Sequence, residues 1–274
     1  MNYNYIKIST KNKVLTITLN RPDRLNAWLQ EMTDEIKVVM NNSIKSNEIR
    51  VIVITGEGRG FCAGADMDSL KNLNLEERKK NQSSNSPYDP FDKDWPVDFQ
   101  RAQTWFPSVP KPIIAAINGP VAGIGLIMAM WCDIRFASSA SFFSTAFSKR
   151  GLIAEHGLSW LLPRLVGMGH ALDMTLSARR ISAKEAERIG FVNKIFDENV
   201  FLKEVYDYAE YLANHVSPRS MKIMKRQLWQ SLLQGLDVAV KIADDEMIKS
   251  FSTEDFKEGV AHFSEKRNAN FTGK

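Results

Sequence analysis

The sequence predicts an α/β fold, in which short buried strands are layered with helices, followed by a helical C-terminal region. Apolar, β-branched runs that end in glycine turns indicate the strands, and an amphipathic repeat between them indicates a helix. A change to helical periodicity alone after residue 200 indicates the C-terminal region. With 274 residues, the chain is long enough to bury a full hydrophobic core.

The first 120 residues alternate strand and helix patterns. Residues 14–19 alternate apolar side chains with threonine, as a half-buried strand does. Between residues 29 and 44, apolar side chains recur at helical spacing and predict an amphipathic helix. Residues 51–54 and 113–117 are short apolar runs before glycine turns, and they are typical of buried strands. Repeated units of this kind indicate an α/β layered core.

Residues 71–100 interrupt this pattern, because they are rich in charged residues, asparagine, serine and proline and hold few aliphatic side chains. Such a stretch is typical of a solvated loop. It also suits a lid that orders over a ligand, since long loops within compact domains are often functional. Both interpretations stay open at this point.

After residue 200 the apolar positions follow a helical period. One stripe consists of Val200, Phe201, Val205, Tyr208, Ala209, Leu212 and Val216. Further helices are predicted around residues 218–234, 236–249 and 254–265. We therefore divide the chain into an α/β core, residues 1–198, and a helical region, residues 199–274.

The composition is that of an ordinary globular protein, with 44% hydrophobic and 25% charged residues. The net charge of +4 suits an anionic ligand and is too small to predict nucleic-acid binding. Two cysteines, Cys62 and Cys132, predict no disulfide framework, so we expect reduced thiols in a cytoplasmic protein. We expect no secretory signal and no membrane association, since the longest apolar stretch, residues 121–132, is too short to span a bilayer.

Two glycine-rich segments carry the chemical signals. Residues 55–67 and 117–126 each begin at the end of a predicted buried strand, and their small residues allow close approach of a ligand. In the second segment an apolar helix begins, and the first N–H groups of a helix lack internal partners, so they can face an anion. Each segment alone also fits a tightly packed corner between two elements. Neither resembles a phosphate-binding loop, because no Gly-Lys-Ser/Thr follows.

Together with four other segments, these two closely resemble the signature sequences of the enoyl-CoA hydratase/isomerase (crotonase) family. The matching segments run in order along nearly the whole chain: NRPDRLNA (20–27), FCAGAD (61–66), AAINGPVAGIG (115–125), GLIAEHG (151–157), LPRLVG (162–167) and FSEKRNANF (263–271). The resemblance implies a crotonase-like spiral of ββα units. It also implies a C-terminal helical region that covers the active site and assists assembly into homotrimers or hexamers.

The resemblance further implies two backbone donors for a thioester oxygen. In the family, the residue after the glycine of the first loop donates one N–H group, and here that residue is Ala65. The second donor is the middle residue of the Gly-x-Gly triplet, which here is Ile124. Many relatives have glycine at this position, so Ile124 predicts a narrower acyl pocket. Preorganised donors of this kind stabilise the charged transition state by about 3–4 kcal/mol each in comparable enzymes.

Coenzyme A is expected as part of the substrate, with no separate cofactor and no metal. The residues expected near its nucleotide end are Arg24, Leu25, Ala27, Ala63, Asp66 and Met67, with Asp66 also expected to anchor the first loop. Phe263 and Lys266 match positions of the terminal helix that contact the adenine nucleotide, often from a neighbouring subunit. Their alternative roles are helix packing for Phe263 and a solvated charge for Lys266.

The acid/base pattern departs from that of the family hydratases. Those enzymes use two glutamates, and the matching positions here are Ile127 and Phe147, neither of which can carry a proton. Glu155 instead matches the position of a catalytic aspartate in dienoyl-CoA isomerases and related members of the family. Its apolar sequence neighbours suggest an apolar site, to which Phe147 also contributes. Glu155 alternatively caps a helix or pairs with Arg150.

We expect an enzyme that isomerises an unsaturated acyl-CoA, with Glu155 as its sole acid/base. Hydration of a 2-enoyl-CoA by the same residue stays open, because one carboxylate can direct a single water. Acyl-CoA hydrolysis is a weaker alternative. Non-catalytic RNA binding is another, but the basic residues form no aromatic-interleaved stripe, so nucleic acid is not an expected partner.

Overall fold

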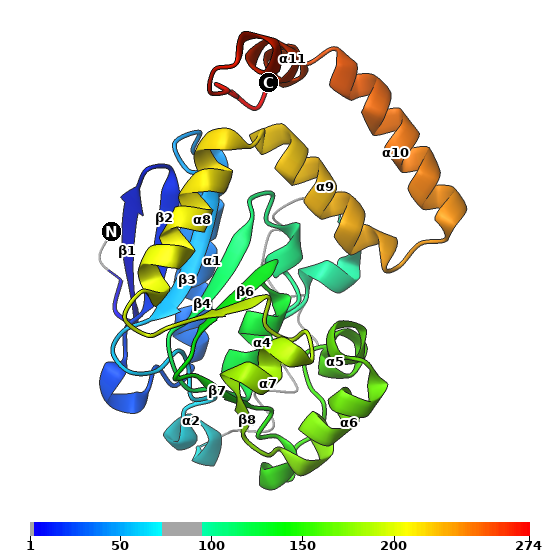
Figure 1. Ribbon diagram of the computed structural model, residues 1–274. Coiled ribbons are helices and arrows are strands. Elements are labelled where there is room, and N and C mark those ends of the chain that lie inside the picture. Colours follow the sequence, from blue (N-terminus) through cyan, green and yellow to red (C-terminus); the bar gives the residue numbers. More distant parts are fainter. Residues whose placement is uncertain (1–2, 73–94) are drawn as a thin grey trace.

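The computed structural model describes residues 3–72 and 95–274 (Figure 1). The predicted loop at residues 71–100 falls mainly outside the described residues. Its two ends are described, as the last residues of α2 (Met67–Lys71) and a 3-10 helix at Val97–Gln100.

A six-stranded sheet forms the centre of the molecule, in the order β1-β2-β3-β4-β6-β9. β1 pairs antiparallel with β2, and every further pair is parallel. The strands are β1 (Ile6–Lys11), β2 (Val14–Leu19), β3 (Val51–Gly56), β4 (Ile113–Ile117), β6 (Ile134–Ser138) and β9 (Lys194–Phe196). The predicted strands at 14–19, 51–54 and 113–117 are therefore confirmed.

Helices cover both faces of this sheet, which is why its inner strands are apolar along their whole length. Side chains of a strand alternate between the faces. Ile52 and Ile54 of β3 pack in the cluster that includes α1 (Gln30–Lys45) and α4 (Ile124–Trp131), whereas Val51 and Val53 pack against α8 (Phe201–His215). The amphipathic helix expected between residues 29 and 44 is α1.

A smaller sheet and four short helices lie between β4 and β9 in the chain. The sheet has the order β5-β7-β8, with β5 (Val121–Ala122), β7 (Phe142–Ser144) and β8 (Ile181–Ser182). The helices are a 3-10 helix at Ser148–Arg150, α5 (Leu158–Val166), α6 (Met168–Ser177) and α7 (Ala183–Arg188). β5 begins directly after the turn at residues 118–120, so the second glycine-rich segment is part of the small sheet.

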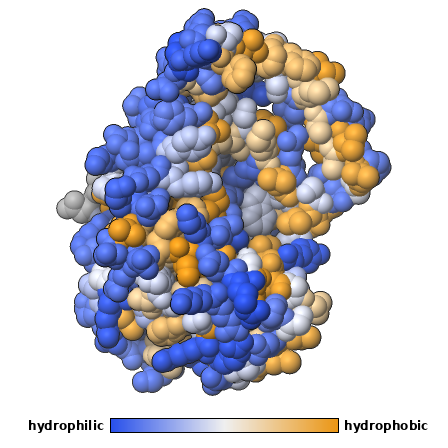
Figure 2. All heavy atoms as spheres, in the orientation of Figure 1, coloured by the Kyte–Doolittle hydropathy of each residue, from blue (hydrophilic) through white to orange (hydrophobic). Residues whose placement is uncertain are grey.

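The C-terminal helices are α8, α9 (Pro218–Ser231), α10 (Leu236–Phe251) and α11 (Glu254–Glu265), as the helical period predicts. α8 covers the sheet, but α10 buries none of its residues and extends away from the core with α11 (Figure 1). Figure 2 shows apolar side chains exposed along this arm. The boundary at residues 198 and 199 stays a prediction. None of the described helices is both long enough and apolar enough to cross a membrane.

Candidate active site

The two glycine-rich segments lie side by side at the carboxyl ends of β3 and β4. These strands are parallel neighbours, so the segments that follow them leave the same edge of the sheet. The backbone amide of Phe61 donates to Pro120 O at 3.1 Å, and that of Ala122 donates to Cys62 O at 2.9 Å. Cys62 and Val121 thus form a parallel bridge that joins the two segments.

The closest approach of the segments is between Gly64 and Gly123. Both residues have positive φ, 106° and 51°, which glycine adopts without strain. A Cβ atom on Gly64 would lie 3.3 Å from Ala122 O, and one on Gly123 would lie 3.6 Å from the Gly64 Cα. This contact brings the next residue of each segment, Ala65 and Ile124, to one place.

The backbone amides of Ala65 and Ile124 are both available to a ligand. Ile124 is the first residue of α4 after the cap Gly123, so its N–H group has no acceptor within the helix. On either side of Ala65, the Trp28 amide donates to Gly64 O and the Asp66 amide donates to Trp28 O. Within residues 3–72 and 95–274, the Ala65 amide itself donates no hydrogen bond. Two unused amides beside a helix N-terminus form a suitable site for a developing oxyanion.

Asp66 holds the first segment in place. Its carboxylate caps α2 by accepting from the amides of Asp68 at 3.0 Å and Ser69 at 3.3 Å, and it pairs with the Arg21 guanidinium at 2.9 Å. The Arg21 hydrogen bond holds the pKa of Asp66 below its usual value. Because both oxygens of this buried side chain have protein partners, Asp66 acts as a positioning group.

The NRPDRLNA segment packs directly on the first glycine segment. The Asn26 side-chain amide donates to Glu57 O at 3.0 Å and Gly60 O at 2.8 Å, and the Ala63 amide donates to Leu25 O at 3.0 Å. Leu25 and Asn26 both have positive φ, which bends the chain around this contact. The structure therefore brings Leu25 into contact with Ala63 and Trp28 into a bridge with Ala65, and coenzyme A binding by Leu25, Ala27 and Ala63 stays a prediction.

Arg24 and Met67 lie at the exposed side of this contact. Arg24 is in the 3-10 helix at Pro22–Arg24, and its guanidinium is 3.4 Å from the Asp68 carboxylate. Met67 is the first residue of α2, and its residue surface is half exposed. Both are accessible beside the turns, where a ligand that enters from solvent can contact them.

Glu155 lies in the loop between the 3-10 helix at Ser148–Arg150 and α5. Its side chain is 26% exposed, and a carboxylate oxygen is 3.5 Å from His156 Nε2. Both alternative roles of Glu155 are absent from the described residues. The cap of α5 is Gly157, and the Arg150 guanidinium donates to the Ala146 carbonyl.

Trp131 holds the loop that carries Glu155. Its indole N–H donates to His156 O at 3.0 Å, and a Cβ atom on Gly157 would lie 2.7 Å from its ring. The ring also stacks on Trp160 and Trp229, with centroids 6.3 Å and 5.7 Å apart. Ile124 is the first residue and Trp131 the last residue of α4, and the eight-residue helix separates them by about 11 Å. α4 therefore connects the Ile124 amide to the loop that carries Glu155.

The structure also supports a role for residues that the sequence left without one. Arg21 orients Asp66, Asn26 bridges the NRPDRLNA segment to the first turn, and Trp131 supports the Glu155 loop. Arg21 and Asn26 lie inside a recognisable motif, which was the available signal. Trp131 had no such signal, because its partners are 25 or more residues away.

The positions of the two hydratase glutamates are buried and apolar. Ile127 is fully buried, and Phe147 is 8% exposed, and both pack in the main core cluster. Trp105 and Phe106 are buried as well, and they stack on each other with ring centroids 4.1 Å apart. No proton donor stands at either glutamate position, whereas the signature segment at residues 151–157 carries Glu155, a partly exposed carboxylate.

Phe263 and Lys266 do not meet the other predicted coenzyme A residues within one chain. Phe263 is on α11 and is 82% exposed, and Lys266 caps the end of that helix with φ of 54°. α11 lies at the opposite end of the molecule from α2 (Figure 1). A contact made from a neighbouring subunit stays a prediction.

Thiolate and metal chemistry find no support among the described residues. Cys62 lies within the first glycine-rich segment, but it is fully buried, and burial raises the pKa of its thiol to about 12. The thiol therefore stays protonated near neutral pH. In the parts of the chain that the structure describes, no group of three His, Cys, Asp or Glu side chains could hold a metal ion.

The chain belongs to the enoyl-CoA hydratase/isomerase family, whose family model matches residues 9–274. It is 30% identical over 273 residues to a 1,2-epoxyphenylacetyl-CoA isomerase of Escherichia coli, covering 98% of this chain and 99% of that protein. It is 32% identical over 269 residues to a short-chain-enoyl-CoA hydratase of Clostridium acetobutylicum, covering 97% of each.

A solved enoyl-CoA hydratase from Bacillus anthracis has the same fold. Its TM-score is 0.88 at 25% identity, covering 99% of this chain and 100% of that chain. The similarity confirms the crotonase-like α/β fold with C-terminal helices. The chain is an enzyme of this family.

Proposed function

We propose that this enzyme isomerises an unsaturated acyl-CoA thioester through an enolate, with Glu155 as the only acid/base and the amides of Ala65 and Ile124 as oxyanion donors. Two observations together support the proposal: residue 155 carries a partly exposed carboxylate, and the two positions that hold glutamates in hydratases, 127 and 147, carry buried apolar side chains. Coenzyme A enters as part of the substrate, and no further cofactor is needed for proton transfer.

The chemistry follows from the acidity of carbons next to a thioester. The Glu155 carboxylate removes a proton from a carbon of the acyl chain, and the electron pair moves through the conjugated system to the thioester oxygen. Two N–H groups stabilise the resulting oxyanion, each by about 3–4 kcal/mol in comparable enzymes. The protonated Glu155 then returns the proton to a different carbon, so the double bond moves and the carboxylate is regenerated.

Hydration of a 2-enoyl-CoA is the second candidate, because several relatives carry hydratase names. In that reaction Glu155 would direct one water, which supplies a hydroxyl to one carbon and a proton to the next. The two reactions differ in their products, since hydration adds the mass of water and isomerisation leaves the mass unchanged.

The test is a panel of 2-enoyl-, 3-enoyl- and dienoyl-CoA thioesters assayed in deuterated water. Isomerisation predicts a product of unchanged formula, apart from deuterium at the carbon that gains the proton. A hydroxyacyl-CoA as the main product would replace isomerisation with hydration. Glu155→Gln is expected to lose at least 100-fold in kcat, since acid–base groups contribute 10²–10⁴-fold. Glu204→Gln, a partly buried carboxylate on α8, is the control and should retain wild-type kcat.

We further propose that the enzyme is a cytoplasmic homotrimer or a hexamer built from trimers. The apolar side chains exposed on the C-terminal arm, α10 and α11, support an interface, because clustered exposed apolar side chains often mark protein–protein contacts. They include Leu236, Ile248 and Phe263. Light scattering after size exclusion should give three or six times 31.1 kDa, and a monomer at micromolar concentration would refute the assembly.

A further inference from the structure

A cavity of about 590 Å³ lies between the core and the C-terminal helices, at the end of the sheet away from the glycine turns. Arg50, which precedes β3, and Pro112, which precedes β4, line it, so it opens at the amino ends of these strands. β3 has six residues, which places the two ends about 20 Å apart. The cavity is therefore separate from the candidate active site.

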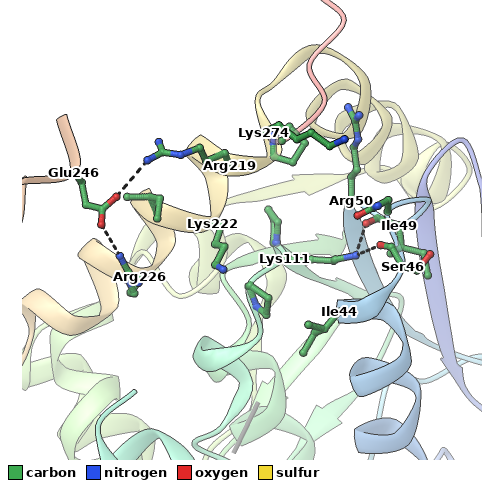
Figure 3. A pocket seen from close by; sticks show the side chains of 16 residues that line it. Ile44, Ser46, Ile49, Arg50, Lys111, Arg219, Lys222, Arg226, Glu246 and Lys274 are labelled. Carbon is green, nitrogen blue, oxygen red and sulfur yellow. Dashed lines mark hydrogen bonds and ion pairs between the residues drawn. The ribbon is translucent and has the colours of Figure 1, made fainter. Parts of the chain in front are cut away.

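The lining of this cavity is strongly cationic. It holds one acidic side chain, Glu246, and six basic ones: Arg50, Lys111, Arg219, Lys222, Arg226 and Lys274 (Figure 3). Isoleucine and proline side chains make up most of the rest of the wall, together with Ser46, Asn47 and Gly273. A mixed wall of this kind suits an anionic group attached to a less polar body.

Two of the basic groups donate hydrogen bonds to backbone carbonyls. The Lys111 ammonium donates to the carbonyls of Ser43, Ser46 and Ile49, and the Arg50 guanidinium donates to two further carbonyls. These bonds fix the wall of the cavity. Their charges nevertheless contribute to its positive potential, because hydrogen bonds to neutral carbonyls do not cancel them.

One face of α9 presents the next three basic groups. Arg219, Lys222 and Arg226 have the spacing i, i+3 and i+7, which places them on the same side of the helix. Arg219 and Arg226 both pair with Glu246, at 3.4 Å and 3.1 Å. Burial opposes ionisation of Glu246, but Lys249, Arg226 and Arg219 together hold its pKa below the usual value.

Lys222 and Lys274 remain available to a ligand. Across residues 3–72 and 95–274, the side chain of neither one takes part in a hydrogen bond or an ion pair. Figure 3 shows Lys222 between the Arg226–Glu246 pair and Lys111. α9 itself is fixed to the core by the buried Lys225–Asp133 ion pair at 2.7 Å, so Lys222 extends from a rigid support.

We propose that this cavity binds a phosphate-bearing small molecule, with Lys222 and Lys274 as its direct charged contacts. The side-chain charge of the lining is six positive against one negative, and a phosphate dianion offsets part of this excess. Lysine is a common phosphate contact because its ammonium donates up to three hydrogen bonds. The isoleucine and proline wall can then accommodate the organic part of the molecule.

The experiment is calorimetric titration of the full chain with inorganic pyrophosphate and with ADP. Coenzyme A is left out, because it carries phosphates and an ADP group and would itself compete for the cavity. We expect saturable binding of both probes at one site per chain. Tighter binding of ADP would indicate a nucleotide as the natural source of the phosphate, and equal binding would indicate the free anion.

Variants assign the binding to this cavity. Lys222→Gln combined with Lys274→Gln should weaken binding at least tenfold, since each removes a charge-assisted hydrogen bond. Lys222→Arg keeps the charge and should bind within threefold of wild type. Lys241→Gln removes an exposed lysine of α10 outside the lining and should change affinity less than twofold.

Three results would overturn the proposal. They are the absence of saturable binding to the wild type, unchanged binding in the double variant, and equal weakening by Lys241→Gln, which would indicate general surface charge. Weakening by Arg24→Gln, beside the glycine turns, that equals the weakening in the double variant would assign the probe to the acyl-CoA site instead. These outcomes do not depend on whether Glu155 is catalytic.

Discussion

Gly157→Ala tests the support of the Glu155 loop most sharply. Gly157 has φ of 76°, where an alanine costs about 1–2 kcal/mol. Its Cβ atom would also lie 2.7 Å from the Trp131 ring. The ring and the loop must then separate by about 0.7 Å to reach an ordinary contact of 3.4 Å. Since Trp131 holds the carbonyl of His156, this shift is transmitted to Glu155.

The chain offers a closely matched control at Gly151. Its φ of 68° and ψ of 19° are nearly those of Gly157, with 76° and 13°, but a Cβ atom there would have no neighbour within 4 Å. Gly151→Ala should therefore cost the same backbone strain without moving Trp131. The difference between the two variants reports the contact with the ring.

We expect Gly151→Ala to lower the free energy of unfolding by about 1–2 kcal/mol and to leave kcat within about threefold of wild type. Gly157→Ala should lose a further 1–3 kcal/mol, roughly the cost of overpacking. Its kcat should fall about 100-fold, because a misplacement near 1 Å can cost that much. Urea unfolding and initial rates on the best enoyl-CoA measure both. Equal kcat in the two variants would refute the proposed support of Glu155 by Trp131.

Three further predictions concern residues around the site. Trp131→Phe keeps most of the ring packing but removes the hydrogen bond to His156, so kcat should fall about tenfold, with roughly 1 kcal/mol lost in urea unfolding; unchanged kcat would contradict this. The Arg21 hydrogen bond is the main cause of the lowered pKa of Asp66 in the folded protein. The ionised Asp66 therefore stabilises the fold at pH values above its unfolded pKa near 3.9, and this stabilisation is lost as the pH falls through the lower folded pKa. Asp66→Asn should therefore reduce stability at pH 7 and flatten its decline below about pH 4, and an unchanged acid profile would show that the Arg21 pair does not couple to folding. Because burial raises the pKa of Cys62 to about 12, native protein at pH 8 should not react there with a thiol reagent, whereas unfolded protein should; rapid native labelling would contradict the burial.

The main elements could be predicted because their residues carry a clear period. The run at residues 51–54 and the repeat at residues 29–44 correspond to β3 and α1. β5 and β8 have two residues each, which is too short for any period, so they emerge only from tertiary contacts. The packing of α8 on the sheet also depends on tertiary contacts, because an apolar stripe does not specify which surface covers it.

The candidate site was only partly predictable, because some of its residues are defined by tertiary contacts alone. Ala65 and Ile124 could be placed because they sit in recognisable glycine segments, and the Gly64–Gly123 contact explains why both glycines are present. The role of Trp131 could not be predicted, because it depends on a hydrogen bond across 25 residues. The alternative in which Glu155 caps a helix is contradicted, since Gly157 is the N-cap of α5.

The most direct test is a crystal structure with an unreactive acyl-CoA analogue bound. The carbonyl oxygen of the analogue should lie about 2.7–3.1 Å from the amide nitrogens of both Ala65 and Ile124. The Glu155 carboxylate should face the acyl carbons. A carbonyl oxygen that contacts neither amide, or an acyl chain that lies away from Glu155, would contradict the proposed mechanism.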